Sequence, residues 1–492
     1  MGDEAPWYEA IGYGLCRCLQ YAIGCAVSLT AVSLTMMAIV DGNSTIQLPV
    51  WVIVGLLVVF ITIIALLEGL HVTIMTLLHA NFAILRGSNA SPGERACLAH
   101  AKATESPERF LLGRQLLLTG FVFAVSELTV IGSDTSSCDC AKRAFGLPVE
   151  VCSFIESTGL GGSLIVLAFG QITPQLIAAS HPVYHFGLPG VYELVSLALM
   201  VEYTGVLHLS WSGAYFARWY FKLNEHETFG VGGHAEVQPL LQDTRQDARQ
   251  DDVVGVEHGE LEDNLHQATT GSGRSSLGLV FRTGQYVVGV LVFGASLYLS
   301  LRQILVGGSD ASWRRRVGGH SYLLIVALLV LLYLMGVLEG MMLAVLALEK
   351  APAAAFTATA PCVVALQKQL VDGDVVRRFL LGRQCMVVVM DFLVERLTGV
   401  IGAVVVVVVS QALPQLISSR NPLFWVTVPG TLWIFHTALL VEATGLTHFG
   451  WLIANCFMLI GRHCGALRED HFSVGAQVVV KYNDEEVNDV ED

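Results

Sequence analysis

Long apolar stretches separated by short polar segments dominate the chain. Each is about 20 residues or longer, which is the length that an α-helix needs to cross a bilayer. The pattern therefore predicts an all-α polytopic membrane protein with about ten transmembrane helices. The stretches lie at 18–40, 49–79, 110–133, 160–180, 187–213, 284–306, 320–349, 379–402, 400–419 and 425–460.

The order of motifs in the first half of the chain recurs in the second half. Arg-Phe-Leu-Leu-Gly-Arg-Gln stands at 109–115 and again at 378–384, and much of the run from 171 to 211 recurs 240 residues later. Each half contains five of the predicted helices. Because five is odd, the second half must enter the membrane upside down relative to the first, giving two inverted five-helix repeats, an arrangement found in secondary transporters.

Charge separates these repeats from two polar segments. The formal net charge is −14, but 224–280 holds eleven acids against three bases, and 463–492 holds eight against two. The remaining body has 23 acids and 23 bases and is electrically balanced. We therefore divide the chain into a first repeat (1–223), an acidic flexible linker (224–280), a second repeat (281–462) and an acidic C-terminal tail (463–492).

The composition limits the class of function. Hydrophobic residues make up 53% of the chain and charged residues 14%, with a mean hydropathy of +0.60. These values exclude a soluble multidomain enzyme and a disordered protein. The sequence has no Walker loop, nucleophile elbow or HExxH motif, and its eleven cysteines include no CxxC pair. We expect no enzymatic activity, no cofactor, no metal centre and no nucleic-acid partner.

Charged side chains inside apolar helices are costly and mark functional sites. Several recur in both halves at matching depth, which favours a central, pseudo-symmetric substrate-binding site. The alternative is that Glu–Arg pairs only tie helices together. The recurring residues are Glu68 and Glu339, Arg114 and Arg383, Glu202 and Glu442, and, beside the arginines, Gln115 and Gln384.

The helix with the second Gly-Arg-Gln segment carries two acids one turn apart. At 3.6 residues per turn, Asp391 and Glu395 lie on the same face as Gln384, whereas the corresponding face in the first half is neutral. Hard cations such as Na⁺ prefer oxygen ligands, so these two acids are our candidates for the coupling-ion or proton site. The alternative is a salt bridge from either acid to Arg383 or Arg396.

Each half also contains a Gln-x-x-Pro-Gln segment inside an apolar helix. A proline there frees the carbonyl four residues earlier, at Gly170 and Ser410. Freed carbonyls beside glutamine amides would form a neutral hydrogen-bonding surface that lines a cavity. A simple helix kink is the alternative. The glutamines that we assign to substrate binding on this basis are Gln171, Gln175, Gln411 and Gln415.

The last apolar stretch of each half carries a further polar pattern. Thr204, His208 and Trp211 share one helix face. Glu202 points to the opposite side, so the four residues can serve one site only if a turn is unwound. The histidine could bind a ligand or report pH, while a tryptophan three residues later also fits an anchor at the membrane interface.

These motifs resemble those of the silicon transporters of diatoms and other silicifying algae, in which Glu-Gly-x-Gln and Gly-Arg-Gln occur in pairs within ten helices. The resemblance extends from about residue 17 to 460. It implies Na⁺-coupled uptake of orthosilicic acid at the plasma membrane. The matching positions are Glu68, Gly69, Gly113, Arg114, Gln115, Glu339, Gly340, Gly382, Arg383 and Gln384.

Two positions depart from the family pattern. The fourth residues of the two Glu-Gly motifs are His71 and Met342, where the family has Gln. His71 can still exchange hydrogen bonds with a hydroxylated ligand, so we include it in the substrate-binding set, whereas methionine cannot donate one. We expect no counterpart of the family's C-terminal coiled coil in the short, acidic segment 463–492.

The residues themselves fit a neutral, hydroxylated solute. Silicic acid is uncharged at pH 7, and glutamine amides in a balanced body can bind its hydroxyl groups without a strong charge. Boric acid, a polyol or a sugar would also fit. We predict a secondary-active transporter in a lipid bilayer that moves silicic acid with Na⁺, with homo-oligomers left open.

Two other functions stay open at this point. One is a proton- or anion-coupled transporter of another solute that uses Arg114 and Arg383. The other is a membrane sensor or scaffold that keeps the fold without transporting. Uptake measurements on the intact protein separate these functions.

Overall fold

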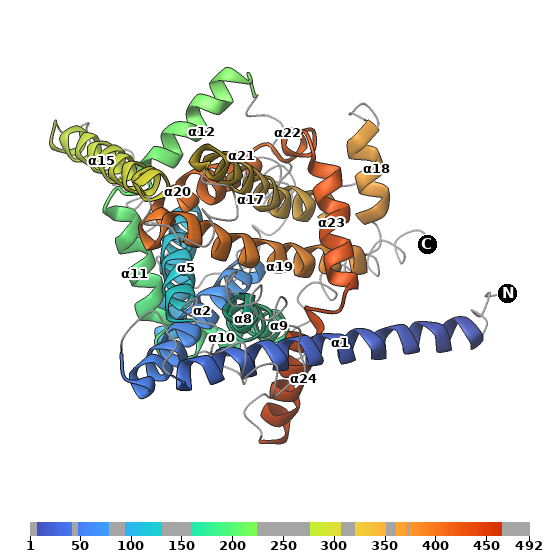
Figure 1. Cartoon of the computed structure of the whole chain (residues 1–492). Helices are drawn as coiled ribbons and strands as arrows, with labels where there is room; N and C mark the ends of the chain where they lie inside the picture. The colour runs from blue at the N-terminus through green and yellow to red at the C-terminus, as the bar shows by residue number, and fades with distance from the viewer. Residues whose placement is uncertain are drawn as a thin grey trace, which may run out of the picture.

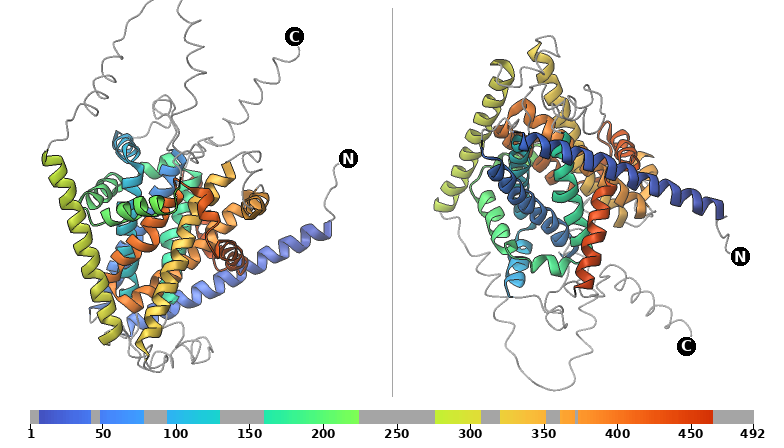
Figure 2. Two further views of the ribbon diagram at one scale, coloured as in Figure 1. Left: turned by 90° about the horizontal axis from the view of Figure 1, so that it is seen from above. Right: turned by 60° about the horizontal axis from the view of Figure 1, so that its bottom comes forward.

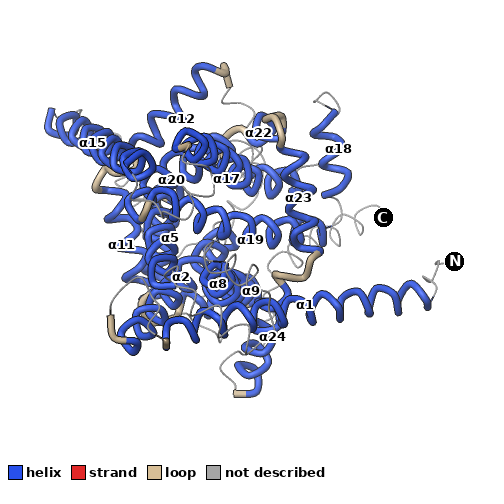
Figure 3. The backbone as a smooth tube through the Cα atoms, viewed as in Figure 1, coloured by secondary structure: helices blue, strands red, loops and turns tan. Residues whose placement is uncertain are grey.

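The computed structural model describes residues 7–41, 48–77, 94–129, 160–223, 276–306, 320–350, 361–370 and 373–464. Within these ranges every regular element is a helix (Figure 3). The predicted fold class, an all-α polytopic membrane protein, is confirmed. The predicted linker and tail lie almost entirely outside the described ranges, so the domain boundaries stay predictions.

The helices follow each other in the same order in the two halves, except that the described part of the second half has one additional short helix, η4. The first half contains α1 (Trp7–Val40), α2 (Val50–Leu77), α4 (Glu94–Glu105), α5 (Pro107–Thr129), α8 (Leu160–Ile165), η1 (Val166–Ile172), α9 (Thr173–Ser180), α10 (Pro182–Phe186), α11 (Val191–Tyr203) and α12 (His208–Tyr220). The second half contains α15 (Ser276–Val306), α17 (Ser321–Lys350), α18 (Pro361–Leu370), α19 (Gly373–Thr398), η4 (Val400–Gly402), α20 (Ala403–Val406), η5 (Val407–Ala412), α21 (Leu413–Ser418), α22 (Pro422–Val426), α23 (Thr431–Ala443) and α24 (His448–His463).

Many of these helices can cross a membrane. Seven of the described segments are long and apolar enough, and two bent pairs, α11 with α12 and α23 with α24, raise the total to as many as nine. The helix α19 has sufficient length, but charged side chains occur along it. The count of ten and the inverted orientation of the halves therefore stay predictions.

The outward faces of α2, α15 and α17 are apolar. Trp51 is 77% exposed, Leu291 65% and Leu329 60%. Large apolar side chains exposed along whole helices mark a surface that contacts a partner or lipid. Together with the apolar spans, they make this an integral multi-pass membrane protein.

The helices α5 and α19 pack against each other in the middle of the molecule (Figure 1). On its other sides α5 contacts α2 and α11, while α19 contacts α17 and α23. Aromatic rings fill the space between α19 and α23, where Phe379 and Phe435 stack with centroids 5.0 Å apart. Both Gly-Arg-Gln segments thus lie on the two central helices.

The first helix of each half packs against the last helices of the other half. In α1 the Gln20 amide donates a hydrogen bond to the carbonyl of Ala443 at 3.1 Å. In α15 the Gln285 amide donates to the carbonyl of Tyr203 at 2.7 Å. Figure 2 shows α1 and α15 on different flanks of the molecule. The first helix of each half therefore contacts the other half near the break between that other half's last two helices.

Candidate functional site

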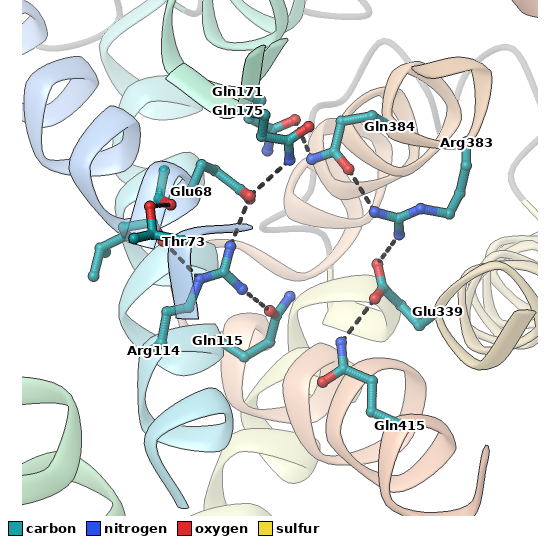
Figure 4. Close-up of polar contacts among 12 residues, drawn as sticks. Glu68, Thr73, Arg114, Gln115, Gln171, Gln175, Glu339, Arg383, Gln384 and Gln415 are labelled. Carbon is teal, nitrogen blue, oxygen red and sulfur yellow. Dashed lines mark hydrogen bonds and ion pairs between the residues drawn. The ribbon is translucent and has the colours of Figure 1, made fainter. Parts of the chain in front are cut away.

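The first polar cluster is built around Arg114 of α5. Its Nη2 lies 2.7 Å from Oε2 of Glu68 in α2, and its Nε donates to the carbonyl of Leu67 at 2.8 Å. Its Nη1 donates to Oε1 of Gln115 at 2.9 Å. The same Glu68 oxygen accepts a hydrogen bond from Nε2 of Gln175 at 2.9 Å. Three helices thus meet at one buried ion pair (Figure 4).

The second cluster repeats this arrangement around Arg383 of α19. Arg383 Nη1 donates to Oε1 of Glu339 in α17 at 2.8 Å, and Nη2 donates to Oε1 of Gln384 at 2.6 Å. Gln415 Nε2 donates to Oε2 of Glu339 at 2.8 Å. Gln384 in turn donates to Oε1 of Gln171 at 2.7 Å, which links this cluster to η1 of the first half. In Figure 4 the two clusters face each other.

Two further hydrogen bonds join the halves along α5. Thr119 Oγ1 donates to Oε1 of Gln411 at 2.8 Å, and Ser126 Oγ donates to Oε2 of Glu395 at 2.6 Å. The position of α19 that matches Thr119 is Val388, which has no hydroxyl group. The two clusters therefore differ in how their glutamines are held, with Gln171 bound by an amide and Gln411 by a hydroxyl.

The glycines of the Gly-Arg-Gln segments allow the central helices to touch their neighbours. A Cβ at Gly113 would lie 1.8 Å from the carbonyl oxygen of Ala198 in α11. At Gly382 it would lie 1.8 Å from the carbonyl oxygen of Ala438 in α23. No side chain fits at either position, so glycine sets the depth at which each arginine sits.

The glycines of the two Glu-Gly motifs face rings. A Cβ at Gly69 would lie 2.0 Å from Nε2 of His185, and one at Gly340 would lie 1.9 Å from the Trp425 ring. Both rings come from the short helices α10 and α22, which follow the Pro-Gln segments. Each ring therefore packs on the residue that follows the glutamate of its own half.

Asp391 lies within electrostatic reach of both Glu68 and Glu339. It is 3% exposed, and its Oδ1 has no hydrogen-bond partner among the described residues. Arg383, its predicted alternative partner, pairs with Glu339 instead. Asp391 is thus a buried carboxyl group close to two ion pairs that are already complete.

His71 lies near the same centre. It is close enough to Arg114 and Arg383 to be affected by both charges, and no hydrogen bond joins it to another described residue. Met342, at the matching position of the second half, is 5% exposed. Of the predicted substrate-binding residues, only His71 has neither an ion pair nor a hydrogen bond in the described structure.

The proline segments are wound as π-helices. The turns η1 and η5 precede Pro174 and Pro414, and Thr173 Oγ1 donates to the carbonyl of Ala168 at 2.7 Å. π-Helical turns are rare and frequently mark functional sites. Gln171 and Gln411 lie in these turns, while the predicted cavity lined by the carbonyls of Gly170 and Ser410 stays a prediction.

The last apolar stretch of each half is broken by a turn, at 204–207 and at 444–447, which is the condition under which the sequence pattern allowed these residues to serve one site. The helices α11 and α12 meet at 65°, and α23 and α24 at 61°. Across the second break, Glu442 Oε1 lies 3.9 Å from Nε2 of His448, and Glu442 Oε2 accepts from Arg378 at 2.8 Å. His448 also packs edge-on against Tyr21 of α1, with centroids 5.0 Å apart. His208 packs in the same way against Tyr286 of α15, with centroids 5.3 Å apart, so both histidines lie at the junction of the halves.

The sequence model of one protein family, described as silicon transporter, matches residues 15–268 and 265–401. This chain belongs to the silicon transporter family. The matched residues include both Glu–Arg pairs and both Gly-Arg-Gln segments, whereas Gln411 and Gln415 lie beyond them. No curated protein and no solved structure matched the chain. The family and the apolar spans together make it a membrane transporter that sits in a lipid bilayer and handles a small solute.

Sequence reasoning on this silicon transporter missed the two rings behind the Glu-Gly motifs. His185 and Trp425 occupy matching positions, 240 residues apart, in the two halves. Because one is a histidine and the other a tryptophan, a search for identical residues did not find them. It also missed the ion pair between Glu108 of α5 and Arg420, whose closest atoms are 3.2 Å apart. A comparison of which repeat positions differ would have pointed to His185.

The geometry of this silicon transporter defines what its centre can bind. Each Glu–Arg pair is internally neutral, and the surrounding amides offer both donors and acceptors. Such a surface can exchange hydrogen bonds with hydroxyl groups without attracting an anion. Asp391 adds a buried carboxyl group whose Oδ1 has no hydrogen-bond partner among the described residues.

Proposed function

We propose that this protein is a secondary-active transporter that takes up silicic acid together with Na⁺ across the plasma membrane. The observation that carries the proposal is the pair of facing clusters, each a neutral Glu–Arg pair with glutamines of its own and of a second helix. Silicic acid is uncharged near neutral pH, and each hydroxyl both donates and accepts. A centre made of amides and neutralised pairs suits such a solute better than it suits an anion, because both of its arginines, Arg114 and Arg383, already pair with a carboxylate.

The support for a coupling cation is the charge balance around Asp391. Arg114 is neutralised by Glu68 and Arg383 by Glu339. A bare carboxylate at Asp391 would be a buried, uncompensated charge, which is unfavourable by several kcal/mol. Bound Na⁺ would remove that penalty, and so would a proton. Glu395, one turn away and bonded to Ser126, is the second acidic oxygen source on this face.

Transport itself is tested with purified protein in proteoliposomes. Uptake of silicic acid, or of germanic acid as a radiolabelled surrogate, is measured with an inward Na⁺ gradient, with a proton gradient and with neither. We expect uptake above empty liposomes that the Na⁺ gradient stimulates. Stimulation by protons alone would replace Na⁺ by H⁺, and no uptake under any gradient would contradict a transporter of this solute.

The coupling site is tested by Asp391→Asn and Glu395→Gln. Asparagine keeps the size of the side chain but removes the negative charge, so we expect D391N to abolish stimulation by the Na⁺ gradient. Glu105→Gln is the matched control, because Glu105 is an exposed acid at the end of α4. Full Na⁺ stimulation in both D391N and E395Q would exclude these acids as the coupling site.

A further inference from the structure

The amides of the two Gly-Arg-Gln segments are held differently. Gln115 and Gln384 occupy matching positions, and the oxygen of each accepts a hydrogen bond from the preceding arginine. In the second half, Gln384 Nε2 also donates to Oε1 of Gln171 at 2.7 Å. In the first half, no hydrogen bond joins Gln115 Nε2 to another described residue. The first cluster therefore has a free amide donor at a position where the second cluster does not.

Thr119, one turn after Gln115 on α5, accounts for this difference. Its Oγ1 donates to Oε1 of Gln411 at 2.8 Å. Gln411 matches Gln171, so its oxygen is the acceptor to which Gln115 would donate if the first half copied the second. The position of α19 that matches Thr119 is Val388, which has no hydroxyl group. Thr119 thus occupies the acceptor that would otherwise hold the Gln115 amide.

The free nitrogen of Gln115 lies deep in the protein. The side chain is 4% exposed, but its Nε2 is not completely enclosed. In Figure 4 this nitrogen points away from Arg114. A buried N–H group without an acceptor is unfavourable by about 1–3 kcal/mol. A hydroxyl oxygen of a bound solute can accept this hydrogen bond and remove the cost.

A second polar group without a partner belongs to the same half. His71 is only partly buried, and no hydrogen bond joins it to another described residue. It lies within electrostatic reach of Arg114. An imidazole can donate and accept hydrogen bonds, whereas Met342, at the matching position, cannot donate one. At both positions where the halves differ, the free hydrogen-bonding group therefore lies in the first half.

We propose that Thr119 is a positioning residue that keeps the Gln115 amide free, so that a small neutral hydroxylated solute binds to Gln115 and His71 of the first half. The Gln115 N–H donates to a hydroxyl oxygen of the solute. The proposal rests on the proposed function and assigns its binding step to one of the two clusters. The second cluster, in which Gln384 is tied to Gln171, then serves to join the halves.

Thr119→Val tests this role, because it gives α5 the residue that α19 has at the matching position. Without the hydroxyl group, Gln115 can donate to Gln411 as Gln384 donates to Gln171. Uptake of radiolabelled germanic acid is measured in proteoliposomes with an inward Na⁺ gradient. We expect KM to rise about two- to tenfold, the value of one hydrogen bond, and the maximal rate to stay unchanged because only binding is weakened.

Thr129→Val is the matched control. Thr129 is also buried and lies on the same helix, but its hydroxyl group bonds only to carbonyls of α5, at 2.9 and 3.1 Å. We expect T129V to keep the KM of the wild type. Thr119→Ser retains a hydroxyl group, so it should restore most of the affinity that T119V loses. Thermal melting confirms that each variant is folded, and equal increases of KM in T119V and T129V would overturn the proposal.

A double variant tests whether Thr119 acts through the amide. Gln115→Met keeps the length of the side chain but removes the donor. If Thr119 acts by keeping that donor free, adding T119V to Q115M should raise KM no further. Independent effects that multiply in the double variant would show that Thr119 acts by another route and would overturn the proposal.

Equilibrium binding of germanic acid to the purified protein in detergent separates this proposal from the proposed function. Wild-type uptake with an unchanged KM in T119V would overturn the role of Thr119 and leave transport intact. Weaker binding by T119V than by the wild type would support that role even if no gradient drove uptake, a result that would contradict transport. No binding by the wild type would overturn the solute site in the first half.

Discussion

At the scale of single residues, the centre of this transporter depends on buried ion pairs. Arg114 is 2% exposed and Arg383 5%, and each has a carboxylate at 2.7 or 2.8 Å. A buried ion pair stabilises a protein little more than well-packed hydrophobic residues would in its place. Removing only one partner, however, leaves an uncompensated charge in an apolar environment. These pairs are therefore far more sensitive to single substitutions than ion pairs at the surface.

We expect Arg383→Ala to lower the free energy of unfolding by about 3–5 kcal/mol, because Glu339 would be left charged and buried. The measurement is denaturant or thermal unfolding in detergent. Arg420→Ala is the matched control, since Arg420 and Glu108 form a partly exposed pair, 32% and 40% exposed. Such a pair contributes less than about 1 kcal/mol. If both variants lost the same free energy of unfolding, burial would not explain the sensitivity of the Arg383–Glu339 pair.

His185 gives the stability of the protein a defined pH dependence. It lies in α10, between two candidate spans, and burial lowers its pKa from 6.5 to about 4. The unfolded chain therefore binds a proton more readily than the folded chain. The contribution of neutral His185 is fully present above pH 6.5 and is lost as the pH falls toward 4, by about 3 kcal/mol in total.

The measurement is the free energy of unfolding of wild type and His185→Asn between pH 7.5 and 4. Asparagine does not titrate, so its curve should fall less steeply, and the difference should be confined to the window between pH 6.5 and 4. Parallel curves for the two proteins would show that His185 is protonated equally in the folded and unfolded states.

At the scale of helices, close contact between backbones sets the geometry of the site. α5 approaches α11 at Gly113 and α19 approaches α23 at Gly382, in each case against a carbonyl oxygen. Backbone cannot yield as a flexible side chain can. The arginine that follows each glycine is therefore positioned by a helix–helix contact as well as by its own hydrogen bonds.

We expect Gly113→Ala to destabilise the protein by about 1–3 kcal/mol and to reduce transport, because the added methyl group must push α5 away from α11. Gly120→Ala on the same helix is the matched control, since a Cβ there meets nothing within 4 Å. Alanine favours helix over glycine, so G120A should be neutral or slightly stabilising. Thermal unfolding and uptake are measured for both variants. Equal stability and equal uptake in G113A and G120A would contradict a close contact between α5 and α11 at Gly113.

At the scale of the molecule, the two halves are interlocked. Gln20 of α1 bonds at the final helices of the second half, and Gln285 of α15 bonds at those of the first half. Ser126 and Glu395 connect the central helices. Each half consequently buries polar groups and apolar surface that only the other half can cover.

We expect two separately expressed fragments, split within the predicted linker 224–280, to assemble into an active transporter when they are produced together. Either fragment alone should be degraded or should aggregate. The surface that normally contacts the other half would expose apolar side chains, and its polar groups would lack their hydrogen-bond partners. Co-purification and uptake are the measurements. The variant Gly24→Leu should assemble less well than the unchanged fragments. A Cβ at Gly24 would lie 2.3 Å from the carbonyl oxygen of Gly445 in the other half. Stable, folded fragments on their own would contradict this interlocking.

The sequence by itself determined the helical membrane fold, the duplication and the motif residues of the site. Hydropathy is a local property, so apolar stretches of membrane length could be recognised without knowing how they pack. Duplication made Glu68, Arg114 and their counterparts visible by simple alignment of one half on the other. Helix periodicity also showed that Glu202 and His208 could serve one site only if a turn between them were unwound, but it did not show that such a turn exists.

Only the tertiary structure decided which of these residues meet. Gln384 bonds to Gln171, whereas the matching Gln411 is held by Thr119. The rings that pack on the two Glu-Gly motifs, His185 on Gly69 and Trp425 on Gly340, likewise became visible only in the structure. Such pairings depend on the distance between helices far apart in the chain, and those distances are set by glycine contacts and ring packing that no local pattern records.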